Sequence, residues 1–223
     1  MTILDESTLP QRDVALSAAM REGSLAEHEA AEHSPFMSEL MGGRVNEQGY
    51  ADYLLRLRAV YETLEATLHA HADDPIVATI HDSAVERLAA IDADLDHWLP
   101  EGPRTVDSPA AAAYCARVEE AGSWGGLLAA HHYTRYLGDL SGGQAIGRIL
   151  DRAFGLEGRG IAFYDFPEIE KPKVYKDGYR ARLDGLGLSE DEVARVVDEV
   201  QVAFRLNQAV FNELAGNLDA YRR

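Results

Sequence analysis

The residues best suited to chemistry lie in the stretch Tyr133-Thr-Arg-Tyr-Leu-Gly-Asp-Leu-Ser-Gly-Gly-Gln144. Within it, Tyr133, Arg135 and Asp139 flank Gly138. Polar side chains of this kind are costly to bury unless they find hydrogen-bonding partners. Their position beside a glycine, where a helix carries no side chain, indicates a ligand site with a polar side.

The chain around these residues has the spacing of a helix. Apolar residues recur three and four positions apart, which predicts a helix over residues 127–154. The glycines inside this helix are Gly138, Gly142, Gly143 and Gly147. Because each glycine in a helix interior costs about 0.5–1 kcal/mol relative to alanine, other interactions must hold this helix together.

At about 100° per residue, Gly138 and Gly142 lie on one face of the helix, and Gly143 and Gly147 lie on another. A face without Cβ atoms lets the backbone come close to another helix or to a flat ligand, and adjacent glycines also allow a kink. Helix packing would explain one bare face. Two bare faces favour a ligand on the second.

The segment Leu140-Ser-Gly-Gly-Gln144 also spells the signature peptide of transport ATPases. A nucleotide-binding domain of that class needs a phosphate loop of the form G-x-x-x-x-G-K-[ST]. No such loop precedes any of the chain's lysines, which are Lys171, Lys173 and Lys176. The chain also lacks the strand patterns of an α/β nucleotide fold, so we exclude this interpretation.

Composition limits the classes of partner. The chain has 223 residues, of which 46% are hydrophobic, and this suits one globular domain. Its net charge of −17 excludes nucleic acid and anionic membranes as general partners. Cys115 is the only cysteine, so no internal disulfide is expected. Because no apolar leader or long apolar span is found, we expect no membrane span and a cytoplasmic location.

A second candidate for chemistry lies in a helix predicted over residues 12–33. His28-Glu-Ala-Ala-Glu-His33 nearly matches the zinc-peptidase pattern H-E-x-x-H. The second histidine comes one residue late, so the two rings point about 140° apart and the simple zinc site is excluded. Glu32 stands four residues after His28 and could orient that ring as a metal ligand. From spacing alone, an exposed and solvated pair is the alternative, and the same solvated state is expected for His33, His69, His71, His81 and His97.

Further helices are predicted over residues 46–70, 83–98, 107–122 and 189–216. Asn46 is a plausible cap, and Ser189 with Glu192 forms a capping box. Tyr61, on the apolar stripe of the first of these helices, has a hydroxyl that needs a partner if it is buried. The sequence therefore predicts an all-α chain, with a disordered N-terminus at 1–11, one domain at 12–216 and a C-terminal tail at 217–223.

All the lysines lie within six residues of one another, and arginines follow them at Arg180 and Arg182. In so acidic a chain this basic cluster is the local exception that an anionic ligand would need. Lys176 and Arg180 share one helical face. A solvated basic face is the alternative.

The stretch from Tyr133 to Gln144 resembles the signature of the heme oxygenases, of the bacterial, biliverdin-producing type, and the likeness runs over residues 14–216. Residues 26–33 look like the family's proximal helix, 174–180 like its propionate-binding helix and 204–211 like its C-terminal helix. The resemblance implies an all-α, single-domain helical bundle. It also implies that heme lies between the proximal helix and a glycine-kinked distal helix.

The same resemblance assigns roles to residues. It implies that His28 is the axial ligand of the heme iron, that Glu32 braces it, and that the distal helix lies closest to the macrocycle at Gly138 and Gly142. Asp139 matches the distal aspartate, which holds a water. The remaining members of the implied distal network are Tyr61, Arg135 and Asn207. His131 and His132, which match no ligand of the family, are the competing metal ligands.

Tyr133, Lys176 and Arg180 match the family's propionate contacts. Arg21 stands where the family usually has lysine, so the resemblance assigns it a propionate contact only by position. Anchored in this way, the heme is expected to be cut at its α-meso carbon.

The reaction implied is oxidative cleavage of heme b to biliverdin, carbon monoxide and ferrous iron, with dioxygen as co-substrate. A ferredoxin or a flavoprotein reductase would donate the electrons. No C-x-x-C-H motif is present, so the heme would be held noncovalently. The alternative function is a heme-binding or carrier protein without catalysis, and Asp139 is the feature that separates the two, because a carrier has no need of a buried distal carboxylate.

Overall fold

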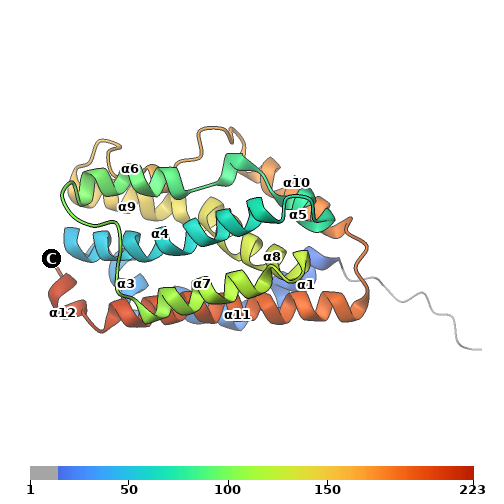
Figure 1. Cartoon of the computed structure of the whole chain (residues 1–223). Coiled ribbons are helices and arrows are strands. Elements are labelled where there is room, and N and C mark those ends of the chain that lie inside the picture. The colour runs from blue at the N-terminus through green and yellow to red at the C-terminus, as the bar shows by residue number, and fades with distance from the viewer. Residues whose placement is uncertain (1–14) are drawn as a thin grey trace, which may run out of the picture.

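The computed structural model describes residues 15–223, and the regular structure in this part of the chain is helical (Figure 1). The all-α prediction is confirmed. The α-helices are α1 (Leu16–Gly23), α2 (Leu25–Glu32), α3 (Pro35–Met41), α4 (Glu47–Ala70), α5 (Pro75–Ile80), α6 (Leu88–Trp98), α7 (Pro109–Ala121), α8 (Gly125–His132), α9 (Gln144–Phe154), α10 (Pro172–Asp184), α11 (Glu190–Ala215) and α12 (Leu218–Tyr221). Shorter helical turns are η1 (Ser83–Val85), η2 (Tyr133–Leu137), η3 (Asp139–Gly143) and η4 (Ala162–Tyr164). The disordered segment predicted at 1–11 lies outside the described residues.

The bundle is built around its two longest helices, α4 and α11. In Figure 1, α6, α9 and α4 lie above α7 and α11, which run along the lower edge. Helix α4 packs against α6 and α7, and α11 packs against α1, α2, α3, α7 and α8. The apolar stripe predicted for α4 is confirmed, since all of its members are buried: Tyr50, Tyr53, Leu54, Leu57, Val60, Tyr61, Leu64 and Leu68.

Side chains cap the starts of several helices, and those of Asn46 and Ser189 are predicted from the sequence. The Asn46 side chain accepts a hydrogen bond from the Gly49 amide at 2.9 Å, and Ser108 caps α7. The capping box of Ser189 and Glu192 opens α11. These bonds satisfy amide groups that the first turn of a helix leaves without partners.

The helix predicted over residues 12–33 is divided in two. Its first residues precede the described part of the chain, and Ser24 separates α1 from α2. The Ser24 hydroxyl donates to the Met20 carbonyl at 2.7 Å, and Gly23 lies so close to α11 that a Cβ there would come within 2.4 Å of Val197. Ser24 has non-helical angles of φ −117° and ψ 13°, so α2, which carries His28, begins as a separate helix at Leu25.

The helix predicted over 83–98 is also divided, into η1 and α6. The Glu65 carboxylate accepts hydrogen bonds from the amides of Arg87 and Leu88 at 2.6 and 3.0 Å. These long-range bonds start α6 at Leu88, and no local sequence pattern indicates them.

The predicted tail at 217–223 contains α12, which packs on the start of α4. The Asn46 amide donates to the Tyr221 carbonyl at 2.7 Å, and Tyr221 is buried. Within residues 15–223, no helix has both the length and the apolar character needed to cross a membrane.

A partly buried polar cluster connects α7 and α8 to α11. Arg117 donates to both carboxylate oxygens of Glu199, at 2.8 and 2.5 Å, and His131 Nε2 lies 2.8 Å from Glu199 Oε1. Burial opposes ionisation of Glu199, but the hydrogen bonds from His131 and Arg117 outweigh it and lower the pKa of this carboxyl to about 2. The carboxylate therefore stabilises the folded state at neutral pH.

We expect Glu199→Gln to lower the free energy of unfolding at pH 7 by about 2 kcal/mol, because charge-assisted hydrogen bonds are lost. The difference in the free energy of unfolding between this variant and the wild type should narrow as the pH falls from 4.5 towards 2. Over this range the wild-type carboxyl is protonated first in the unfolded chain and then in the folded chain. Denaturant unfolding at pH 7 and pH 3 measures this. Asp198→Asn, an exposed carboxylate on the same helix, is the control, and an equal loss in both variants would contradict the assignment.

Candidate functional site

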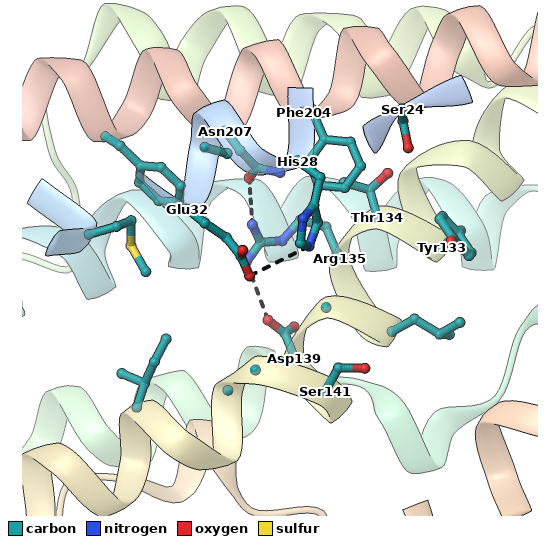
Figure 2. A pocket seen from close by; sticks show the side chains of 18 of the residues that line it. Ser24, His28, Glu32, Tyr133, Thr134, Arg135, Asp139, Ser141, Phe204 and Asn207 are labelled. Atoms are coloured by element: carbon teal, nitrogen blue, oxygen red, sulfur yellow. Dashed lines mark hydrogen bonds and ion pairs between the residues drawn. The ribbon is translucent and has the colours of Figure 1, made fainter. Parts of the chain in front are cut away.

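A cavity of about 520 Å³ lies between α2, α11 and the segment η2–η3. Figure 2 shows His28 and Asp139 approaching it from different helices, with Arg135 and Asn207 behind. Most of the residues singled out from the sequence line it: Arg21, His28, Glu32, Tyr133, Arg135, Gly138, Asp139, Gly142, Arg180 and Asn207. Tyr61 and Lys176 do not line it but contact residues that do.

The two bare faces of the glycine-rich helix have different neighbours. A Cβ built on Gly143 or Gly147 would lie 3.1 or 3.0 Å from the buried Tyr164, so this face packs against η4. A Cβ on Gly138 or Gly142 would meet nothing within 4 Å, and both glycines line the cavity. Packing explains one face, as expected, and the other leaves backbone open to a ligand.

The helix is widened at the glycines. Both η2 and η3 are π-helical turns, and Gly138 between them keeps helical angles of φ −60° and ψ −51°. Single π turns inside α-helices are frequent at functional sites. The backbone therefore passes the cavity as a continuous but wider helix, rather than breaking there.

A polar network lies under the open face. The Tyr61 hydroxyl donates to Asp139, and Arg135 Nε donates to the Tyr61 oxygen at 3.1 Å. Arg135 also donates to Asn207 Oδ1 at 2.5 Å and lies 3.6 Å from Asp139. Arg135 as a residue is only 5% exposed, so these partners compensate its buried charge.

The network sets the protonation of its members. Burial raises the pKa of Asp139, while the Arg135 charge and the Tyr61 hydrogen bond oppose that rise. Burial also raises the pKa of Tyr61 well above its usual value, so Tyr61 remains a hydrogen-bond donor. Asp139 is thus held at a fixed position with a carboxyl that takes up a proton more readily than an exposed one.

His28 reaches the cavity from α2. Its Nε2 lies 3.6 Å from Glu32 Oε1, and its ring makes an edge contact with Phe204 of α11 at 5.3 Å between centroids. The side chain is 46% exposed. The predicted pair therefore exists, and the accessible imidazole leaves a nitrogen for a ligand in the cavity.

The competing histidines are committed to other contacts. His131 pairs with Glu199, and His132 Nδ1 lies 2.9 Å from the Tyr179 hydroxyl, with the two rings stacked. Burial lowers the pKa of His132 to about 3, so it is neutral. Neither ring lines the cavity.

Positive side chains gather at the rim. Arg180 and Arg21 line the cavity beside Tyr133. Lys176 Nζ donates to Ser141 Oγ at 3.0 Å, which connects α10 to η3. This arrangement suits an anionic group at the cavity mouth.

Sequence reasoning missed contributors of the cavity wall. Phe204 packs on His28, and Ser141 holds Lys176. Phe204 follows the same period as the core residues of α11, so its sequence gives no signal that separates it from them. Ser141 does have a signal in the sequence, because it lies between Gly138 and Gly142 in the glycine-rich stretch.

Comparisons with known proteins agree on one family. The family model described as "Heme oxygenase" matches residues 14–213. The heme oxygenase of Rhodella violacea is 35% identical over 209 residues, which cover 92% of this chain and 89% of the relative. The heme oxygenase structure from Leptospira interrogans has a TM-score of 0.86 at 35% identity and covers 90% of this chain and 100% of that chain. Heme oxygenase-1 from Synechocystis sp. PCC 6803 in complex with heme gives 0.88 at 35% identity, over 93% and 95% of the two chains.

The two glycine faces should respond differently to substitution. We expect Gly142→Leu to leave the free energy of unfolding unchanged or up to about 1 kcal/mol higher, because its side chain enters open space and leucine favours helix. Gly147→Leu should lower it by about 1–3 kcal/mol through overpacking against Tyr164. Denaturant unfolding of both variants tests this, and similar losses in the two would refute the division of faces.

Proposed function

The chain belongs to the heme oxygenase family and is a heme-degrading enzyme, and we propose that its cavity between α2 and η2–η3 holds heme b as substrate. The observation that carries the proposal is the pairing of two features across one cavity. His28 approaches from α2, and the bare backbone of Gly138 and Gly142 lies on the distal segment with Asp139 between them.

The residues fit this ligand. Small-molecule sites are mostly apolar clefts of about 300–1,000 Å³ with a few placed polar groups, and the cavity has this character at about 520 Å³. Its apolar lining includes Leu25, Met37, Leu137, Ile146, Phe204 and Phe211. A planar macrocycle needs a close flat wall, which the open glycine face supplies.

On the proximal side, we assign His28 as the axial ligand of the iron. A carboxylate near a ligating imidazole fixes the ring and raises its basicity, and Glu32, at 3.6 Å, has that position. At the rim, Tyr133, Arg180 and Arg21 would meet the propionates, with Lys176 close by on Ser141. Charge-assisted hydrogen bonds of this kind fix the in-plane orientation of the ring.

When bound, heme supplies the iron that activates dioxygen towards the ring itself. The chain's own distal residues control water and protons. Asp139, fixed by Tyr61 and Arg135, holds a water on this side, and its raised pKa brings proton exchange closer to neutral pH. Asn207 fixes Arg135 in turn.

The products in this proposal are biliverdin, carbon monoxide and ferrous iron. The electrons would come from a ferredoxin or a flavoprotein reductase, and we place the reaction in the cytoplasm. A heme carrier would share the fold and the ligand. Biliverdin formation with a reductase in air therefore tests the activity directly.

We expect His28→Ala to lose the axial nitrogen ligand of bound hemin, and added imidazole to restore the ferric spectrum. Visible spectroscopy of the hemin complex measures this. His33→Ala is the control, because its ring is exposed, binds the Glu29 carbonyl and does not line the cavity. A wild-type spectrum from His28→Ala would move the ligand elsewhere.

We expect Asp139→Ala to keep hemin affinity within about tenfold, roughly 1.4 kcal/mol, and to lose most biliverdin production, because water is no longer held. Hemin titration and pigment yield with a reductase measure the two effects separately. Asp151→Ala, whose carboxylate accepts from the Gly158 amide outside the cavity, is the control. Biliverdin formation at the wild-type rate in Asp139→Ala would reject the role.

A further inference from the structure

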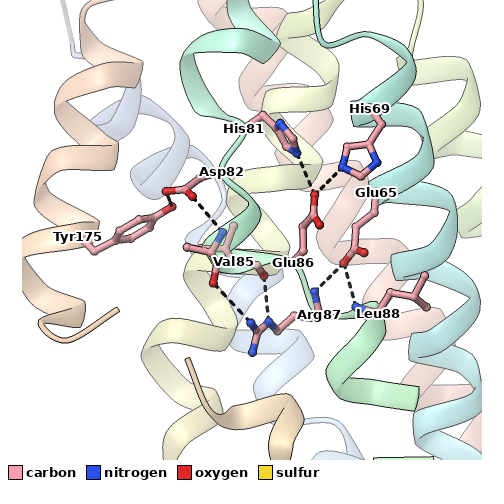
Figure 3. Close-up of polar contacts among 10 residues, drawn as sticks. Glu65, His69, His81, Asp82, Val85, Glu86, Arg87, Leu88 and Tyr175 are labelled. Atoms are coloured by element: carbon pink, nitrogen blue, oxygen red, sulfur yellow. Dashed lines mark hydrogen bonds and ion pairs between the residues drawn. The ribbon is translucent and has the colours of Figure 1, made fainter. Parts of the chain in front are cut away.

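A second group of potential metal ligands lies outside the heme cavity, where α4, α5 and η1 meet. His69 is on the last turn of α4, His81 is the C-cap of α5, and Glu86 follows η1. One ligand atom from each lies within 4.8 Å of the other two. Figure 3 shows both imidazole rings directed at the Glu86 carboxylate, whose Oε1 lies 2.6 Å from His69 Nε2 and 3.0 Å from His81 Nε2.

The backbone under these ligands is fixed. Each ligand follows a buried apolar residue in the sequence, and these anchors are Leu68, Ile80 and Val85. The Asp82 side chain caps η1 through the Ala84 amide at 3.0 Å, and Glu65 binds the amides of Arg87 and Leu88 immediately after Glu86. The fold therefore holds the backbone positions that carry the three side chains.

The side chains themselves remain accessible. Their exposed fractions are 55% for His69, 23% for His81 and 25% for Glu86. An ion can reach them from solvent, and the net charge of −17 raises the local concentration of cations. As a surface contact alone, each His–Glu pair would contribute little to stability, because solvent screens exposed ion pairs.

We propose that His69, His81 and Glu86 bind a first-row divalent cation that prefers imidazole, of which Zn²⁺ is the representative. Two imidazole nitrogens and one carboxylate oxygen form a known zinc ligand set that leaves further positions to water. Adjacent ligand atoms around tetrahedral zinc are about 3.3 Å apart. The observed distances of 2.6 and 3.0 Å must open by about 0.7 and 0.3 Å, which solvent-accessible side chains allow. Mg²⁺ and Ca²⁺ prefer oxygen ligands and should bind poorly.

The experiment is a Zn²⁺ titration of the full chain in competition with a chromophoric chelator, in excess Mg²⁺. We expect one Zn²⁺ per chain at this site in the wild type. His81→Ala and Glu86→Gln should each weaken binding at least tenfold, and Glu86→Gln keeps the shape of the side chain. His97→Ala, an exposed histidine outside the group, should bind as the wild type does.

Repeating the titration after loading with hemin separates this site from the cavity. Zinc held by His28 and Glu32 would be lost on loading, whereas zinc held by His69, His81 and Glu86 would remain. The proposal is overturned if the wild type binds no Zn²⁺, or if its affinity equals that of His81→Ala and Glu86→Gln. Far-ultraviolet circular dichroism of each variant verifies that the fold is intact.

Discussion

The buried guanidinium of Arg135 is the interaction on which the distal side of the cavity depends. A charge at 5% exposure is stable only with partners, and Arg135 finds them on three elements: Tyr61 on α4, Asn207 on α11 and Asp139 on η3. One side chain thus connects the two longest helices to the segment that passes the cavity. Because Tyr61 binds both Arg135 and Asp139, the position of the carboxyl is set by the bundle core rather than by the distal segment alone.

The contacts of Arg135 help the glycine-rich segment to remain helical. Glycines weaken a helix, and π turns such as η2 and η3 are rare in helices. The packed face with Gly143 and Gly147 against Tyr164 offsets part of this cost, and the buried side chains of η2 supply more. The open face at Gly138 and Gly142 can then remain free of side chains, so that backbone itself forms one wall of the cavity.

Much of this could be predicted from the sequence, because it rests on local signals. The stripe of α4, the caps at Asn46 and Ser189, and the two glycine faces all follow from spacing along one helix. Breaks caused by distant partners could not be predicted: Glu65, more than twenty residues earlier, sets the start of α6. The packing of Phe204 on His28 and the convergence of His69 with Glu86 likewise join separate helices. The spacing of such residues along a helix shows only whether a face is apolar or polar, and not which other element packs against that face.

The buried carboxyl of Asp139 links the fold to the proposed chemistry. Burial raises the pKa of this carboxyl because desolvation makes its charged form costly, and the Arg135 charge opposes that cost. An apolar residue would leave Arg135 with only the neutral partners Tyr61 and Asn207, and a buried guanidinium without a carboxylate partner destabilises the fold. The buried pair of Arg135 and Asp139 therefore stands or falls together, and the water-holding role proposed for Asp139 uses a carboxyl that the fold already places at the cavity wall.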